Sequence, residues 1–130
     1  MSGEKDLKVL LSNLMPRLLP DTYVFCLIEG GSYGNLGEAN PIASFQESEG
    51  LSLILSKTDA DKHRLKYEGE YKGISLDVHS SLEAVGMTAA IATKLTAHNI
   101  SANIIAAYHH DHLFIPSKDA EKALDLLRDI

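Results

Sequence analysis

The chain has 130 residues, of which 45% are hydrophobic and 23% are charged, and its formal net charge is −6 with a pI of about 5.4. This composition is typical of one globular domain or two very small ones, and the lack of a basic cluster argues against a nucleic-acid partner held through its phosphates. No apolar run reaches the roughly 18 residues of a membrane span, and the start MSGEKDLK lacks the basic and apolar regions of a signal peptide, so we expect no membrane partner.

The first seventy residues predict a helix, three strands and a second helix. Leucines at positions 7, 10, 11 and 14 recur at helical spacing, which predicts a helix over Lys5–Met15 with Pro16 and Pro20 bracketing its exit. The strands are then expected at Thr22–Ile28, Pro41–Gln46 and Gly50–Ser56. A short helix follows over Thr58–Tyr67, which either Ser56 or Thr58 can cap.

Residues 29–40 interrupt this half of the chain with four glycines and no helical pattern. The segment lacks the spacing of a phosphate-binding or dinucleotide-binding loop. A surface insertion is the favoured interpretation, and a ligand lid with Tyr33 at its tip is the alternative. The single cysteine, Cys26, lies in an apolar run and has no intrachain partner, which indicates a core residue and a reducing, cytoplasmic location.

The second half predicts strand, helix, hairpin and helix. The alternation over Gly73–His79 predicts a half-buried strand, and Met87, Ala90, Ile91 and Leu95 form an apolar stripe of helical period. Ile100–Tyr108 is apolar enough for a strand covered on both faces, with a two-residue turn at His110-Asp111 and a returning strand at Leu113–Ile115. The last helix is expected over Ser117–Asp129, with these residues inward: Ala120, Ala123, Leu124 and Leu127.

An internal repeat connects the two halves. Residues 53–62, LILSKTDADK, parallel residues 113–122, LFIPSKDAEK, and each copy follows helix, strand, strand. We therefore predict two domains, 1–70 and 71–130. Neither half has all the strands of a closed unit, and an unpaired sheet edge favours pairing. We therefore expect either that the two halves exchange strands with each other or that a second chain supplies the missing strands.

The helix start Val85-Gly86-Met87-Thr88, followed by the hairpin from Tyr108 to Pro116, resembles the ACT domain. The similarity is strongest to small stand-alone bacterial ACT-like proteins, and it is good from about residue 72 to residue 128. It implies an α+β fold of two ferredoxin-like βαββαβ units in tandem, with strands shared or exchanged between the halves. It also implies a small regulatory ligand, commonly an amino acid, no further cofactor, and a homodimer or higher homo-oligomer.

In ACT domains the loop between strand and helix lines the effector site, where helix amides suit a carboxylate. The resemblance thus points to these ligand-binding candidates: Glu83, Ala84, Val85, Gly86, Met87, Thr88, Asn103 and Ile104. Many members that bind amino acids carry Asp or Asn just before the glycine, whereas this chain has Ala84 and Val85, with Glu83 as a substitute acid. An alternative role for Gly86 is close packing of helix and strand, without any ligand. For Asn103, the alternative is that a backbone group, rather than a ligand, provides the hydrogen-bond partner of its side chain.

Three histidines flank Asp111 in the hairpin. If the turn has two residues, His109 and His112 face each other closely enough to share a metal ion. His79 or Asp77 could add a ligand only if their strand lies alongside. The favoured alternative is a polar hairpin tip that binds no metal.

Three functions follow from these patterns. The favoured one is a non-catalytic regulatory protein that binds a small molecule. The second is a protein-interaction module without a ligand, which the missing acid before Gly86 favours. The third is a metal-dependent enzyme built on the histidine cluster. No nucleophile–histidine pair can be inferred from spacing, because such sites are recognised by geometry.

Overall fold

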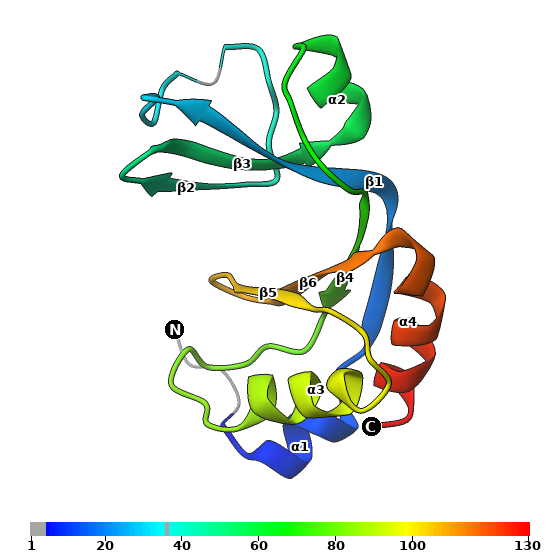
Figure 1. Cartoon of the computed structure of the whole chain (residues 1–130). Coiled ribbons are helices and arrows are strands. Elements are labelled where there is room, and N and C mark those ends of the chain that lie inside the picture. The colour runs from blue at the N-terminus through cyan, green and yellow to red at the C-terminus, as the bar shows by residue number, and fades with distance from the viewer. Residues whose placement is uncertain (1–4, 36) are drawn as a thin grey trace. The chain divides into compact units, whose positions relative to one another are not determined.

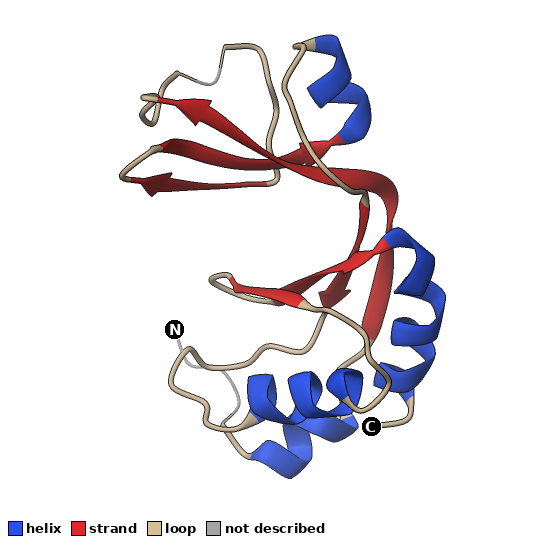
Figure 2. Cartoon of the chain, in the orientation of Figure 1, coloured by secondary structure: helices blue, strands red, loops and turns tan. Residues whose placement is uncertain are grey.

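The computed structural model describes residues 5–35 and 37–130. The chain forms two compact units, whose helices and strands are shown in Figures 1 and 2. The α3 unit comprises the chain up to Pro20 and Lys72–Ile130, and the α2 unit comprises Asp21–Tyr71. Within the described residues, no helix is long and apolar enough to cross a membrane.

The α3 unit is a helix-covered antiparallel sheet. Its elements in chain order are α1 (Leu7–Ser12), the first part of β1 (Pro16–Glu29), β4 (Tyr71–Leu76), α3 (Met87–Thr96), β5 (Asn103–Ala106), β6 (Asp111–Pro116), the 3-10 turn η1 (Ser117–Asp119) and α4 (Ala120–Arg128). The strand order is β1–β4–β6–β5. From β4 to α4 the elements run strand, helix, strand, strand, helix, and β1 provides the closing strand beside β4. Both α3 and α4 cover one face of this sheet (Figure 1).

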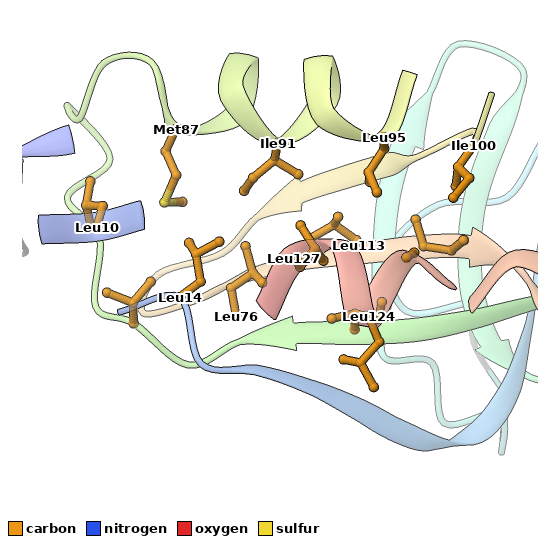
Figure 3. Close-up of a cluster of buried hydrophobic side chains, with 14 residues drawn as sticks. Leu10, Leu14, Leu76, Met87, Ile91, Leu95, Ile100, Leu113, Leu124 and Leu127 are labelled. Carbon is orange, nitrogen blue, oxygen red and sulfur yellow. The ribbon is translucent and has the colours of Figure 1, made fainter. Parts of the chain in front are cut away.

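The core of the α3 unit lies between these helices and the sheet. Met87, Ile91 and Leu95 are buried on one side of α3 and point toward the sheet, where Leu76 and Leu113 lie (Figure 3). Leu10 and Leu14 also belong to this core, although they are more than fifty residues from β4 in the sequence. The N-terminal segment is therefore part of the packing of this unit. The inward residues predicted for the last helix, all confirmed as buried, complete this face: Ala120, Ala123, Leu124 and Leu127.

The α2 unit contains the rest of β1 with β2 (Ala43–Glu47), β3 (Gly50–Ser56) and α2 (Lys57–Lys62), in strand order β2–β3–β1. Its smaller core includes Val24, Leu53 and Leu55. The Ser56 hydroxyl accepts a hydrogen bond from the Asp59 amide at 3.1 Å, which confirms one of the two predicted caps of α2.

Two strands serve both units. The strand β1 passes from one unit into the other, and β4 begins at Tyr71, the last residue of the α2 unit, and continues in the α3 unit. Within the α2 unit the ring centroids of Tyr71 and Phe25 are 5.0 Å apart. The structure thus confirms the predicted α+β fold with strands shared between ferredoxin-like halves. The compact units nevertheless differ from a simple division at residues 70 and 71, because residues up to Pro20 pack with the second half.

The N-terminal helix is shorter than predicted. Instead of Lys5–Met15, α1 covers Leu7–Ser12, and the chain turns at Met15, which has a φ of 47°. The prediction that Pro16 and Pro20 bracket the exit of this helix is wrong, because α1 ends at Ser12 and both prolines lie in β1. Pro16 is its first residue, a position where a missing N–H removes no ladder hydrogen bond.

The hairpin also differs from its prediction. Ala106 pairs with Asp111, so the turn consists of the four residues 107–110 rather than His110-Asp111. The strand β5 is short, and its residues are exposed or half-buried instead of covered on both faces, because β5 is the edge strand. Conversely, β4 is buried on both faces from Gly73 to Leu76, where alternation had predicted one exposed face.

Candidate functional site

A cavity of about 130 Å³ lies in the α3 unit, where the loop after β4 leads into α3. Four of the predicted ligand-binding residues line it: Ala84, Gly86, Met87 and Thr88. The other lining residues were not predicted: Ser80, Ser81, Leu82, Ala106 and Asp111. The loop, the start of a helix and the end of the hairpin thus meet at one cavity.

The loop is held by short-range hydrogen bonds. The Ser81 hydroxyl accepts from the Glu83 amide at 3.1 Å, and the Ser81 carbonyl accepts from the Ala84 amide at 3.0 Å. Such a serine turn reverses the chain locally. Gly86 then adopts a φ of 99°, a conformation that favours glycine. A Cβ at this position would approach the Leu7 side chain to 3.2 Å.

The start of α3 faces the cavity without a side-chain cap. Gly86 occupies the capping position, and its carbonyl accepts the first helical hydrogen bond, from Ala90, at 2.9 Å. The amides of the first turn of any helix have no partner within the helix, and they carry a partial positive charge. Because Met87 and Thr88 line the cavity, this end of the site is suited to an anionic group.

An acidic side chain at the same cavity belongs to Asp111, the first residue of β6. Its side chain is only 6% exposed, and its carboxylate accepts a hydrogen bond from the Ser80 hydroxyl at 3.0 Å. The sequence prediction missed Asp111 because it placed this residue inside a two-residue turn. A four-residue turn at 107–110 would have placed an acid at the start of a buried strand, where it would have been recognised as a candidate.

The remaining predicted residues do not line the cavity. Glu83 is largely exposed and pairs with Lys5 at 3.0 Å, and Val85 is 82% exposed. The Asn103 amide donates to the Phe114 carbonyl at 3.2 Å, so a backbone group satisfies it. Ile104 is half-buried against the core. Ligand contacts by any of the eight candidates stay predictions.

The histidines form a cluster beside the cavity, although not the predicted one. His112 pairs with Ile105 across the ladder, so the expected face-to-face pair with His109 is wrong. Instead the ring of His79 stacks on His109 at 5.1 Å and lies 5.0 Å from His110, whose buried Nδ1 has no hydrogen-bond partner among the described residues. No three His, Cys, Asp or Glu side chains in the described part of the chain are arranged to hold a metal ion.

Two titratable side chains with altered pKa values, His112 and Asp77, lie near this cluster. Burial, reinforced by the nearby His110, lowers the pKa of His112 below its ordinary value. Burial raises the pKa of Asp77, but hydrogen bonds from Arg17 at 3.1 Å and from Ser75 at 3.0 Å outweigh burial and hold that pKa below its ordinary value. The Arg17 guanidinium is therefore engaged by Asp77.

Larger hollows in the α2 unit have less suitable walls. One of about 590 Å³ is lined by residues 65–68 alone, so a single chain segment would contact a ligand. Another of about 280 Å³ is lined in part by Asp21, Tyr23 and Asp59. Burial and the charge of Asp21 raise the pKa of Tyr23. Asp21 and Asp59 in the wall of this second hollow would repel a carboxylate, whereas the helix amides at the start of α3 would attract one.

Two family models match the chain in tandem. A model of the ACT domain matches residues 2–72, and a second ACT domain model matches residues 68–129. A comparison with curated proteins finds no match.

Solved structures share the fold. A Vibrio cholerae protein of unknown function, described as a possible transport protein, is 46% identical, with 93% of this chain and 92% of that chain covered and a TM-score of 0.84. The ligand-free regulatory subunit of aspartate kinase from Thermus thermophilus is 14% identical, with 90% and 97% covered and a TM-score of 0.68. Escherichia coli aspartokinase III, in complex with aspartate and ADP, is 15% identical, with 88% and 32% covered and a TM-score of 0.65. At these low identities the two kinase structures show similarity of fold only.

Proposed function

The chain belongs to the ACT domain family, and from this premise we propose that it is a non-catalytic regulatory protein that binds a small molecule, first of all an amino acid. The cavity of about 130 Å³ at the start of α3 carries the proposal. It combines uncapped helix amides with a buried carboxylate, which are complementary to the two charged groups of an amino acid. The similarity to regulatory subunits of aspartate kinase supports a regulatory role.

Thermal unfolding in the presence of single amino acids tests this proposal. A ligand that binds only the native state stabilises it by about 2.7 kcal/mol at a hundredfold excess over its Kd, which raises Tm by several degrees in a domain of this size. We expect a saturable increase with at least one of the twenty amino acids. If none raises Tm in the folded protein, the proposal fails.

A pair of variants places the binding event in the cavity. Ala106→Phe would fill part of the cavity, because Ala106 lines it. Ala107→Phe adds the same ring to the next residue, which is exposed and does not line this cavity. We expect the ligand-induced increase in Tm to be lost in the first variant and retained in the second. Retention in Ala106→Phe would show that the effect does not depend on this cavity.

Exposed apolar side chains favour the alternative of a protein-interaction module. Leu82, Val85 and Tyr108 are 71%, 82% and 64% exposed. Two of them lie in the loop before α3 and one lies in the hairpin turn. Apolar groups of this size at a surface often mark a protein contact. Absence of any ligand effect, together with capture of a partner that the variant Val85→Glu no longer binds, would favour this function.

The same side chains support a homodimer. A second copy of the chain would remove them from water, and β5 is an edge strand with unpaired backbone groups on its outer side. Light scattering after size-exclusion chromatography measures the mass. We expect twice the mass of one 14.2 kDa chain, and a monomer for the double variant Leu82→Glu, Val85→Glu.

The expected cytoplasmic location stays a prediction that the single, buried cysteine supports.

A further inference from the structure

We infer that Asp111 binds the cationic nitrogen of the ligand, so that this site selects a small molecule with an ammonium group over the same molecule without one. This inference rests on the proposed function and adds to it a specificity-determining residue. It also assigns the role to the hairpin rather than to the loop before Gly86, whose one acid, Glu83, pairs with Lys5 and does not line the cavity.

The position of Asp111 is the first argument. Asp111 lines the cavity and is 6% exposed, and its partner in the ladder, Ala106, lines the same cavity. The Ser80 hydroxyl donates to Oδ2 at 3.0 Å, which fixes the orientation of the carboxylate. A group entering the cavity would therefore meet an oriented acceptor.

The charge of Asp111 is the second argument. A carboxylate removed from water is costly unless a positive charge or several donors compensate it. In the described part of the chain, Arg17 pairs with Asp77 and Lys5 pairs with Glu83, and no ion pair includes Asp111. Its side-chain hydrogen bond comes from a neutral hydroxyl, and the titratable group on which its charge acts is the half-buried His112, whose pKa is lowered. An ammonium group from outside would supply the missing positive charge.

The nearest titratable groups belong to the histidine cluster. His79 and His110 precede Ser80 and Asp111 in the sequence, and their rings lie 5.0 Å apart. His112 follows Asp111 in β6. A positively charged imidazole beside the carboxylate would compete with a bound ammonium for it. Burial lowers the pKa of His112 below its ordinary value. The test is made at about pH 8 to minimise such competition.

The size of the cavity limits the rest of the ligand. Its volume of about 130 Å³ is well below the roughly 300–1,000 Å³ of a typical small-molecule pocket. An amino acid whose carboxylate meets the α3 amides and whose ammonium meets Asp111 has space for a very small side chain. Glycine, L-alanine and L-serine are therefore the probes of choice.

The experiment compares each probe with its hydroxy acid: glycolate, L-lactate and L-glycerate. The hydroxy acids keep the carboxylate and replace the ammonium by a hydroxyl. In wild-type protein we expect one or more amino acids to raise Tm and the matching hydroxy acid to leave it unchanged. Equal effects of both members of a pair would overturn the inference while leaving ligand binding intact. This comparison needs no variant, so it does not depend on whether a variant folds.

The variant Asp111→Asn removes the charge and keeps an oxygen that can accept the Ser80 hydrogen bond. We expect Kd for the amino acid, measured by calorimetry, to rise about tenfold to a hundredfold. The matched controls are Glu83→Gln, which neutralises the acid suggested by the sequence, and Asp77→Asn, which neutralises an acid outside the cavity. Both controls should retain wild-type Kd. Unchanged binding by Asp111→Asn, or loss in Glu83→Gln instead, would overturn the inference.

The outcomes also separate this inference from the proposed function. If only a larger amino acid raises Tm, the size argument fails and the proposed function stands, and the comparison of that amino acid with its own hydroxy acid then decides the inference. If no amino acid raises Tm, both fail.

Discussion

Gly86 shows how one residue can serve the fold and the site together. Its φ of 99° allows the loop to enter α3, and its lack of a side chain leaves space for Leu7 of α1. The same residue lines the cavity. The sequence had left open whether this glycine is needed for packing or for a ligand, and its position provides a physical reason for each.

The substitution Gly86→Ala should lower the free energy of unfolding by roughly 1–3 kcal/mol, because it adds backbone strain to a tight contact with Leu7. Gly34→Ala is the matched control, since Gly34 also has a positive φ, 105°, but open space around its Cα. Urea denaturation of both variants measures the difference. The Gly86 variant should lose more stability, and Leu7→Ala in the same chain should recover part of the loss. Equal losses at the two glycines would show that the contact with Leu7 is unimportant.

His112 should make stability dependent on pH. Its pKa in the folded protein is lowered, chiefly by burial, so the unfolded chain binds a proton first as pH falls. Above the unfolded pKa of about 6.5 the residue is neutral in both states and has no effect, and below it the unfolded state is favoured. Stability should thus fall between about pH 7.5 and about pH 5.5.

Urea denaturation at those two values tests the role of His112. In His112→Gln the fall in stability should be smaller than in wild type. The exposed His98 provides the control, and His98→Gln should keep the wild-type pH dependence. A fall of unchanged size in His112→Gln would assign the effect to other groups.

Asp111 illustrates which site residues a sequence can reveal. The loop residues Gly86, Met87 and Thr88 could be predicted because they are contiguous and follow a family pattern. Asp111 and Ser80 could not, because they are 31 positions apart and meet only when the hairpin pairs in its actual register. The predicted turn placed His109 opposite His112, whereas the actual partner is Ile105, so an error in the turn changes which side chains lie opposite one another.

Among the elements, α4 and α1 show when the spacing of apolar residues is sufficient to predict a helix and its buried face. The apolar stripe of α4 predicted its buried residues correctly, because Ala123, Leu124 and Leu127 pack into the one core between the helices and the sheet. In α1 the stripe was real, and Leu10 and Leu14 are buried. The helix nevertheless ends at Ser12, because the chain must turn at Met15 to begin β1. Tertiary pairing thus overrode a local preference.

The helix α3 should contribute strongly to stability through one face. Ile91 is 1% exposed, between the sheet and the other helices. Ile91→Ala should reduce the free energy of unfolding by about 2–5 kcal/mol, because it removes buried methyl groups and leaves a void. Thr93→Ala, two residues further on the exposed side, should change it by less than about 0.5 kcal/mol. Similar losses in both variants, measured in urea, would contradict the packing described for α3.

At the scale of the whole molecule, the strand that the repeat predicted to be missing from each half is supplied by the same chain. The strand β1 closes the α3 unit beside β4, and the N-terminal leucines complete its core. The sequence indicated that a strand was lacking in each half, because strand and helix counts can be read from periodicity. It could not decide between exchange within the chain and pairing with a second chain, because both satisfy the same backbone groups.

This arrangement predicts that the C-terminal half cannot fold alone. Residues 71–130 lack β1 and also lack Leu10 and Leu14, which are 0% and 2% exposed in the intact protein. We expect this fragment to show no cooperative thermal transition by circular dichroism. A permuted chain, in which a flexible linker joins Ile130 to residues 5–20, restores both the strand and the leucines. It should unfold cooperatively, and the double substitution Leu10→Asp, Leu14→Asp should abolish its transition. A fragment 71–130 that folds as a monomer would contradict the shared-strand arrangement, since the closing strand would then be dispensable. A fragment that folds only as a dimer would show that a second chain can replace β1.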